Sequence, residues 1–524
     1  GDVVHREDRI YGDGVNVAAR IESLADPGGI CISRGVFAQV RKKVPQGFEY
    51  LGEHIVKNII EPVTIYRVLL APEYEGRVIG ELVTKTTKLK RPALVAIATL
   101  FIASVSLLLM FYPRVPDIEP ASIDKLAFPL PDKPSIAVLP FVNLSGDPNQ
   151  EYFSDGITEH IITSLSKVPY ILVIARNSSF TYKNKAVKVQ NIAEELGVQY
   201  ILEGSVQRSD DRVRITAQLI DAIAGHHLWA DTYDRKLEDI FSLQDEIAIK
   251  LMAELQLELT VEELGRLSAT KTTNIKAYEK YLLGYAFLLR RTEEDSRQAR
   301  KLAEEAIAID PGFSAAYQLL ARLYFDNYWY YKTESPKETL NKAEKMIRKS
   351  IDLSVQDATS HYLLGILYFL RRQYDEAVSE CKKAIELSPN SAEANFRYAQ
   401  ALRYAGQFEE AILYHKKAIR LNPITPMSYI NNLAWAYAYS EQYEKAIPIW
   451  NKVIERNPDY FFAYLGLSML YQLSGNENKA REAAAEVMRL KPNLTVSKIA
   501  KGPATRGFDR KRGLEALRKA GIPD

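Results

Sequence analysis

"YLLGILYFLRRQYDEAVSECKKAIELSP", residues 362–389, is a clear copy of a pattern that fills the carboxy-terminal part of the chain. Gly365 lies in its first half and Ala377 in its second half, with Tyr368 between them and Pro389 at its end. Small side chains let two helices approach closely, an aromatic side chain fills the seam, and proline ends the second helix. We therefore expect two packed helices here.

This pattern recurs along the chain with a nearly constant spacing. Pro389, Pro423, Pro458 and Pro492 lie 34, 35 and 34 residues apart, and Val355 holds the corresponding place 34 residues before the first. Small residues keep this register in the first helix of each unit, at Gly365, Ala399, Ala434 and Ser468, and in the second, at Ala377, Ala411, Ala446 and Ala480. This period is that of the tetratricopeptide repeat, whose units bury their apolar faces against their neighbours.

We expect an α-solenoid of six such repeats over residues 275–492, followed by a cap or tail over residues 493–524. Such arrays resemble solenoids that bind proteins or peptides, so a protein or peptide is the expected partner. One unit carries an insertion, DNYWYYKTESPK, residues 326–337, with consecutive aromatic side chains from Tyr328 to Tyr331. These aromatic residues fit either a partner-binding bulge or packing between repeats.

The middle of the chain, residues 134–258, has a different pattern. Short apolar strands such as PSIAVLPF and YILVIAR alternate with helical stretches such as NIAEELGV, which predicts an α/β domain. The segments IAVLPFVNLSGDP and YILEGSVQR resemble the TolB amino-terminal-like domain. That resemblance implies a fold without a reaction, and we expect no catalytic residue in this region.

A run of 20 uncharged residues, 93–112, predicts one transmembrane helix. A basic juxtamembrane linker, residues 73–92, precedes it, and a proline-rich linker with mixed charge, residues 113–133, follows it. The basic flank predicts a cytoplasmic amino-terminal side. We therefore expect a single-pass protein of the bacterial inner (cell) membrane, with its carboxy-terminal domains in the periplasm.

The composition sets broad limits on the function. The 524 residues carry a net charge of only +2, with 47% hydrophobic residues, which disfavours both disorder and a nucleic-acid partner. Cys31 and Cys381 lie too far apart in sequence for a metal-ligand spacing, and we expect both as buried small side chains. The length predicts several domains, and the fold class is multidomain, α/β plus all-α.

The amino-terminal stretch RIYGDGVNVAAR, residues 9–20, carries the pattern that points to chemistry. Apolar residues at helical spacing predict a helix over residues 15–26, which places Asn16 and Arg20 one turn apart on the same face. A guanidinium and an amide on one face suit an anionic oxygen cluster, although a solvated surface helix gives the same spacing.

Residues 1–72 resemble the carboxy-terminal half of a class III adenylate/guanylate cyclase catalytic domain. The resemblance rests on RIYGDGVNVAAR, the strand GGICIS, the helix RGVFAQV and the closing hairpin FEYLGEHIVKNIIEPVTIYRVLL. It implies conversion of a nucleoside triphosphate to a cyclic nucleotide, with Asn16 and Arg20 as the catalytic residues that stabilise the transition state. Lys57 in the hairpin is the expected substrate-binding residue, in contact with the triphosphate.

The resemblance also implies cofactors and assembly. Cyclases of this class use two metal ions, Mg or Mn, in a site shared by two catalytic domains, so we expect a homodimer. Their metal-binding Asp residues belong before Gly1 of this sequence, so the chain alone is expected to hold no metal and to be inactive as a phosphorus-oxygen lyase. Asp8 and Arg9 stand where many members select adenine, so ATP and GTP both stay open.

Two functions follow from these patterns. The first is a membrane-bound signalling enzyme, in which outward-facing domains bind a protein or peptide and regulate a cyclase. The second is a membrane-anchored repeat scaffold that carries a degenerate remnant of a cyclase. Asn16, Arg20 and Lys57 together favour the first.

Overall fold

The computed structural model describes residues 4–6, 9–11, 21, 24–54, 62–80, 119–267 and 272–524. The chain divides into two compact units, residues 1–113 and residues 114–524. Each unit has its own packed core, and the two are described separately below.

The first unit contains a four-stranded sheet in the order β3-β5-β4-β6. Strands β4 and β5 form the predicted closing hairpin, paired from Gly47 opposite Leu69 to His54 opposite Val63, with a register shift between Tyr50 and Gly52. The predicted helix RGVFAQV is present as α2, and the predicted strand GGICIS is present over its last four residues, as β3. The elements of this unit are β1 (Val4–Arg6), β2 (Arg9–Tyr11), β3 (Ile30–Ser33), α2 (Arg34–Val40), β4 (Gly47–His54), β5 (Val63–Leu69), η1 (Pro72–Tyr74) and β6 (Val78–Ile79).

A small aromatic core holds α2 on this sheet. The ring of Phe37 stacks on that of Tyr66 at 3.9 Å and meets that of Phe48 edge-on at 5.1 Å. All three side chains are buried. Cys31, in contrast, is only half-buried, so our expectation of a buried side chain was wrong for this cysteine and is confirmed for Cys381.

The second unit begins with a sheet that has helices on both faces, and we call residues 119–267 the sheet domain. Its strands are β7 (Ser135–Val138), β8 (Val142–Asn143), β9 (Leu172–Val173), β10 (Tyr200–Ser209), β11 (Arg212–Asp221) and β12 (His226–Lys236). They lie in the order β12-β11-β10-β7-β9, with β8 paired to β10. The first three are antiparallel, whereas β10, β7 and β9 are parallel.

Alternate residues of these strands face different helices. Leu202 packs in one core with the helices α4 and α7, and its neighbour Ile201 packs in the opposite core with α6. The helices are α4 (Glu151–Leu165), α5 (Arg176–Ser179), α6 (Val189–Leu196), α7 (Ile240–Glu254) and α8 (Val261–Leu267). Short 3-10 turns are η2 (Ile123–Lys125), η3 (Pro148–Gln150), η4 (Phe180–Tyr182) and η5 (Leu237–Asp239).

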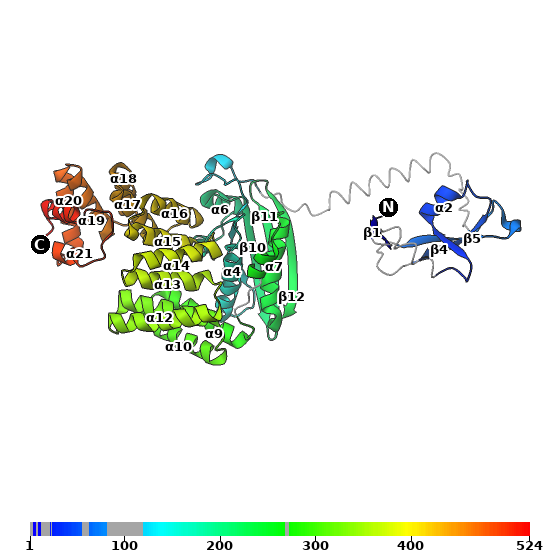
Figure 1. Ribbon diagram of the computed structural model, residues 1–524, viewed down its shortest axis with the longest axis horizontal. Coiled ribbons are helices and arrows are strands. Elements are labelled where there is room, and N and C mark those ends of the chain that lie inside the picture. The colour runs from blue at the N-terminus through cyan, green and yellow to red at the C-terminus, as the bar shows by residue number, and fades with distance from the viewer. Residues whose placement is uncertain are drawn as a thin grey trace. The chain divides into compact units, whose positions relative to one another are not determined.

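Residues 272–524, the repeat domain, stack as pairs of helices beside the sheet (Figure 1). The pairs are α9 (Ile275–Arg290) with α10 (Glu293–Ile309), α11 (Ser314–Asp326) with α12 (Pro336–Leu353), α13 (Ala358–Leu370) with α14 (Tyr374–Leu387), α15 (Ala392–Ala405) with α16 (Phe408–Leu421), α17 (Met427–Tyr439) with α18 (Tyr443–Arg456), and α19 (Phe461–Leu473) with α20 (Glu477–Leu490). A π-helix, η6 (Asn327–Tyr331), follows α11. The chain ends with α21 (Val496–Ala500) and α22 (Arg510–Ala520), which packs on α19.

The small residues of the repeat pattern lie where two helices touch. An added Cβ at Gly365 on α13 would overlap the sulfur of Cys381 on α14, and one at Gly466, two residues before Ser468 on α19, would overlap the ring of Trp450 on α18. The corresponding Ala399, Ala434 and Ser468 are fully buried. The close approach of paired helices therefore explains the pattern that predicted them.

The sheet domain and the repeat domain share two apolar cores. Leu282 of α9 and Phe313 pack in the core of α4 and α7, while Phe396 of α15 and Tyr429 of α17 pack in the core of α6. The sheet domain thus contacts the solenoid at both its first and its fourth and fifth helix pairs. The contacts fix one domain on the other at two separate places.

The expected fold class and localisation both need correction. We expected a partial α+β cyclase domain, a transmembrane helix, an α/β TolB-like domain and an α-solenoid. The described residues instead form a small amino-terminal sheet region and, in the second unit, a sheet domain joined to a repeat solenoid. None of the helices in the described part of the chain combines the length and apolar character needed to cross a membrane.

The physical reason lies in the helices themselves. The longest one described, α12, has 18 residues, and charged side chains follow its outer face because each repeat helix buries only one side. The predicted span, residues 93–112, lies outside the described residues. The single-pass inner-membrane localisation, with a cytoplasmic amino terminus and a periplasmic carboxy terminus, is therefore not supported by the described structure and is withdrawn.

Candidate functional site

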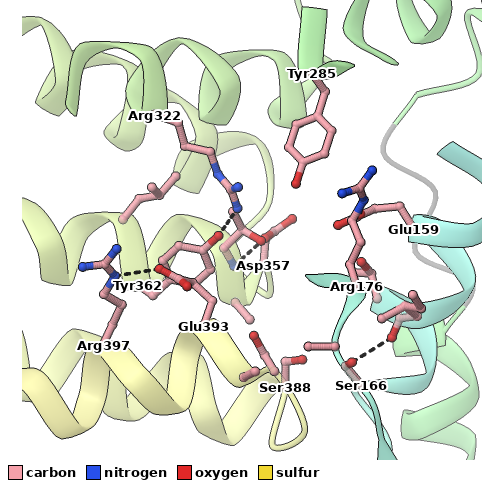
Figure 2. Close-up of a pocket in the computed structure, with 18 of the residues that line it drawn as sticks. Glu159, Ser166, Arg176, Tyr285, Arg322, Asp357, Tyr362, Ser388, Glu393 and Arg397 are labelled. Atoms are coloured by element: carbon pink, nitrogen blue, oxygen red, sulfur yellow. Dashed lines mark hydrogen bonds and ion pairs between the residues drawn. The ribbon is translucent and has the colours of Figure 1, made fainter. Parts of the chain in front are cut away.

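A cavity of about 520 Å³ lies between the sheet domain and the repeat domain, and we call it the chamber. Figure 2 shows Glu159 and Arg176 projecting into it from one side and Arg322, Tyr362 and Arg397 from the other. This volume is in the range that holds small organic ligands in proteins. The chamber is the candidate site that we build below from its residues.

The repeat register decides which side chains reach the chamber. Gly284 on α9 and Ala321 on α11 occupy the small-residue position of their repeats, and both are buried. The residue that directly follows each of them lies one position further around the helix axis. These following residues, Tyr285 and Arg322, line the chamber. The first helices of successive repeats thus present these side chains to the chamber.

Arg322 is the central cation of the chamber. Its Nη2 donates a hydrogen bond to the hydroxyl of Tyr362 on α13, and its guanidinium lies 5.9 Å from the ring of Tyr285 and 5.6 Å from that of Tyr362. Aromatic faces attract a cation, so these two rings hold the guanidinium in place. Within the described residues, no Asp or Glu forms an ion pair with Arg322.

A second cluster lies on α15 and α17. Arg397 Nε donates to Glu393 Oε1 at 2.7 Å, one helical turn away, and the hydroxyl of Tyr429 donates to Glu393 Oε2 at 2.9 Å. Burial alone opposes ionisation of Glu393, but the charge of Arg397 and the two hydrogen bonds bring its pKa below the ordinary value. This carboxylate is therefore ionised and already paired.

The third cluster belongs to the sheet domain. Ile157, Ile161 and Leu165 of α4 are buried against the sheet, which turns Glu159 toward the solenoid. Arg176, which begins α5, forms an ion pair with Glu159 at 2.6 Å between Nε and Oε2. Burial raises the pKa of the Glu159 carboxyl, although the charge of Arg176 acts in the opposite direction.

The insertion of the second repeat forms part of the chamber wall. Trp329 of η6 lines the cavity, and the guanidinium of Arg397 lies 5.9 Å from its ring. The side chain of Asn327 is buried and accepts hydrogen bonds from Thr333, which closes the insertion on itself. Tyr328 and Trp329 also pack against the repeat core, which supports the packing alternative, and partner binding by this insertion stays a prediction.

Asp326, at the end of α11, is a further acid that lines the chamber. Burial raises its pKa to about 6, against the lowering effect of Arg291, Arg322 and Arg397. The carboxyl of Asp326 therefore titrates close to neutral pH.

Direct hydrogen bonds close the chamber at its lower edge. The backbone N–H of Asn390 donates to the carbonyl of Ser166 at 3.0 Å, and its side-chain Nδ2 donates to the carbonyl of Val168 at 2.5 Å. Ser178 donates to Asn422 Oδ1 at 2.6 Å, from α5 to the loop after α16. The loops between repeats are thus bonded to the sheet domain.

The site residues expected from the sequence are not in this chamber. Asn16, Arg20 and Lys57 all lie outside the described residues, so their catalytic and substrate-binding roles stay predictions. Within the described ranges, no three His, Cys, Asp or Glu side chains cluster closely enough to hold a metal ion.

Sequence reasoning missed the chamber residues. Arg322, Glu393 and Arg397 are charged positions in the first helices of repeats, where most neighbours are apolar. A charge on such a helix is a usable signal, because it must face a groove rather than the core. No sequence pattern shows that Glu159 and Arg176, more than 140 residues before Arg322, close the other side.

Comparison with known families identifies the repeats. Residues 340–423 and 431–494 match family models of the tetratricopeptide repeat, so the chain carries tetratricopeptide repeats as expected. Residues 132–250 match the family model described as the second domain of the HilA/YgeH-like transcriptional regulator. The expected TolB-like domain over residues 134–258 is therefore not supported, and the likeness of this region is to the HilA/YgeH-like domain.

A curated relative carries a cyclase name. The chain is 39% identical over 381 residues to "Putative adenylate cyclase 3" of Rhizobium meliloti (strain 1021). The match covers 72% of this chain and 57% of the relative, so the chain spans little more than half the length of that protein.

Solved structures show a partial likeness to this chain. PilF of Pseudomonas aeruginosa is 18% identical with a TM-score of 0.35, covering 42% of this chain and 94% of PilF. PilW, a type IV pilus biogenesis factor, is 20% identical with a TM-score of 0.36, covering 44% and 100%. YrrB, described as a tetratricopeptide protein with an unusual peptide-binding site, is 20% identical with a TM-score of 0.30, covering 38% and 97%.

Proposed function

We propose that this chain belongs to a class III nucleotide cyclase, in which the sheet domain and the repeats regulate synthesis of a cyclic nucleotide. The observation that carries this proposal is the 39% identity over 381 residues to a relative named as an adenylate cyclase. The motif RIYGDGVNVAAR, residues 9–20, supports it through the resemblance to the cyclase catalytic domain.

The proposed chemistry assigns roles to three residues of the first unit. Arg20 and Asn16 stabilise the charge that develops on the α-phosphorus as the ribose hydroxyl attacks it and pyrophosphate leaves. A guanidinium and an amide are suited to this, because both donate hydrogen bonds to phosphoryl oxygens in a fixed geometry. Lys57 binds the triphosphate as a point charge. ATP and GTP are both possible substrates.

Class III cyclases employ Mg or Mn ions and a site that two catalytic domains share, and we extend both features to this protein as a homodimer. The described residues offer no ligand set for a metal ion, so no step of the proposal depends on one.

The repeats supply the binding function. Tetratricopeptide repeats generally bind proteins or peptides, and here their concave side opens into the chamber. A protein or peptide segment that enters the chamber contacts both the sheet domain and the repeats, so its binding energy depends on how the two are arranged. A ligand that prefers one arrangement shifts the population toward it, which is the physical basis for regulation.

The test is a product assay on the gene product that contains this chain. The purified protein is incubated with ATP or GTP and a divalent cation, and cyclic nucleotide and pyrophosphate are quantified. We expect equal amounts of both products from one of the two triphosphates. A protein that folds and binds a polypeptide ligand but forms no cyclic nucleotide from either would overturn the proposal and leave a repeat scaffold.

A further inference from the structure

The arginines that line the chamber differ in whether a carboxylate pairs with them. Arg176 pairs with Glu159 at 2.6 Å, and Arg397 pairs with Glu393 at 2.7 Å. Arg322 lies between these two pairs in Figure 2, and its guanidinium donates a hydrogen bond to the neutral hydroxyl of Tyr362. Among the chamber arginines that are not solvent-exposed, Arg322 alone is without a carboxylate partner in the described part of the chain.

The guanidinium of Arg322 cannot lose its unpaired charge by deprotonation. Arginine stays charged in proteins and offers five N–H donors in a planar fork, of which Tyr362 accepts one. A partly buried charge without a counter-charge at contact distance is costly, and an anion that enters the chamber would remove that cost.

The acids of the chamber favour the same sign of ligand. Glu393 accepts hydrogen bonds from Arg397 and Tyr429, and Glu159 is held by Arg176. These two carboxylates are therefore engaged within the protein. Asp326 also lines the chamber, but burial disfavours its charged form, so it is a poor partner for a cationic ligand below about pH 6. An anion, in contrast, finds the remaining donors of Arg322.

The walls of the chamber are partly apolar, and they limit the size of the ligand. Leu289, Trp329, Leu363 and Ile366 line it together with the ring of Tyr285. Hydrogen bonds between the repeats and the sheet domain, at Ser166 and at Ser178 of α5, close one side, and η6 bounds another. The volume of about 520 Å³ suits a molecule the size of a short peptide end or a small metabolite rather than a long extended chain.

We propose that the chamber binds a small organic anion, whose carboxylate or phosphate group pairs with the guanidinium of Arg322 while its apolar part packs against Trp329 and Tyr285. This inference rests on the proposed binding function of the repeats and names the chemistry of the ligand. The same anionic group can come from a free metabolite or from the carboxyl terminus of a peptide.

The test is calorimetric titration of the full chain with defined probes. Free small anions are represented by 3-phenylpropionate and phenyl phosphate, and a chain terminus by a tetrapeptide that ends in phenylalanine with a free carboxylate. The neutral controls are 3-phenylpropanamide and the same tetrapeptide with an amidated terminus. We expect at least one anionic probe to bind with a Kd below about 1 mM and its neutral counterpart to bind at least about tenfold more weakly.

Variants assign the binding to Arg322. Arg322→Met keeps the hydrocarbon stem but removes the charge, and we expect at least a tenfold loss of affinity, about 1.4 kcal/mol. Arg322→Lys keeps the charge without the planar fork, so we expect this variant to bind the probe with intermediate affinity. Such binding would also show that the fold tolerates a substitution at this position. Arg297→Met, at an exposed position of α10, is the matched control and should bind as the unchanged chain does.

The outcomes separate this inference from the proposed function. Binding by phenylpropionate or phenyl phosphate supports a metabolite, and binding only by the free-carboxylate tetrapeptide supports a chain terminus. Equal affinity for charged and neutral probes, no binding by any anionic probe at about 5 mM, or unchanged binding by both Arg322 variants would overturn the inference. A gene product that makes cyclic nucleotide but fails these titrations leaves the proposed enzymatic function intact.

Discussion

The side-chain amide of Asn390, in the loop between α14 and α15, donates a hydrogen bond of 2.5 Å to the backbone carbonyl of Val168 in the sheet domain. The backbone N–H of the same residue donates to the carbonyl of Ser166. Asn390 is buried, so one side chain joins the two domains at the edge of the chamber.

This contact predicts a measurable loss of stability. Asn390→Ala removes the amide donor and leaves the carbonyl of Val168 buried without its partner, which costs about 1–3 kcal/mol. The free energy of unfolding from urea titration, followed by tryptophan fluorescence, measures it. Asn493→Ala, at an exposed position of the carboxy-terminal region, is the matched control and should change the free energy by less than about 0.5 kcal/mol. Equal losses in both variants would argue against the domain contact.

The helix contact at Gly365 predicts a coupled pair of substitutions. Gly365→Ala places a methyl group against the sulfur of Cys381, and overpacking of this kind costs about 1–3 kcal/mol. Adding Cys381→Ala frees that space, so the double variant should be more stable than the sum of the two single effects predicts. Thermal unfolding of the four chains gives the coupling energy. Gly265→Ala, where an added Cβ meets nothing within 4 Å, is the control and should not be destabilised.

Part of the fold behind these two predictions could be predicted from the sequence, and part could not. The helix pairs were predictable because Gly365, Ala399 and Ala434 repeat at a fixed local spacing, and each contact involves neighbouring segments. The α2 helix and the β4–β5 hairpin followed from local pattern and from the resemblance in the same way.

The chamber, in contrast, depends on contacts between distant segments. Ser178 and Asn422 are 244 residues apart in sequence, and no periodicity links them. The sheet domain and the repeats share two apolar cores. In the sequence of either domain alone, the apolar residues of these cores cannot be told from those of an ordinary core. The inferred membrane localisation rested on a single apolar run outside the described residues, without any tertiary contact to test it.

Asp326 predicts a pH dependence of stability. Its pKa of about 6 in the folded chain lies above the value near 4 of an unfolded aspartate. Between about pH 4 and pH 6 the unfolded state therefore binds fewer protons than the folded state, so stability falls as the pH rises through this window.

Asp326→Asn removes this effect. Relative to the unchanged chain, the variant should gain stability from pH 4 to pH 7, by an amount on the order of 2 kcal/mol. Unfolding free energies in urea at pH 4, 5, 6 and 7 measure the difference, with the exposed Asp352→Asn as the control. A difference that does not change with pH would contradict a raised pKa at Asp326.

The insertion predicts a contrast between adjacent aromatic residues. Trp329 lines the chamber, whereas Tyr330 next to it is 65% exposed. Trp329→Ala should weaken binding of the anionic probes by about tenfold, because it removes apolar contact area from the cavity wall. Tyr330→Ala should leave the affinity unchanged. Equal effects of both substitutions in calorimetric titration would show that η6 acts through packing between repeats alone.

The most direct measurement of the central claim is the rate of cyclic nucleotide formation by the gene product with Asn16→Ala, Arg20→Ala, or the exposed control Lys43→Ala in the same unit. Loss of one transition-state donor costs about 10²–10³ in kcat, so we predict that decrease for Asn16→Ala and for Arg20→Ala, with no change for Lys43→Ala. Turnover that survives both substitutions undiminished would contradict the assignment of this chain to a catalytic cyclase.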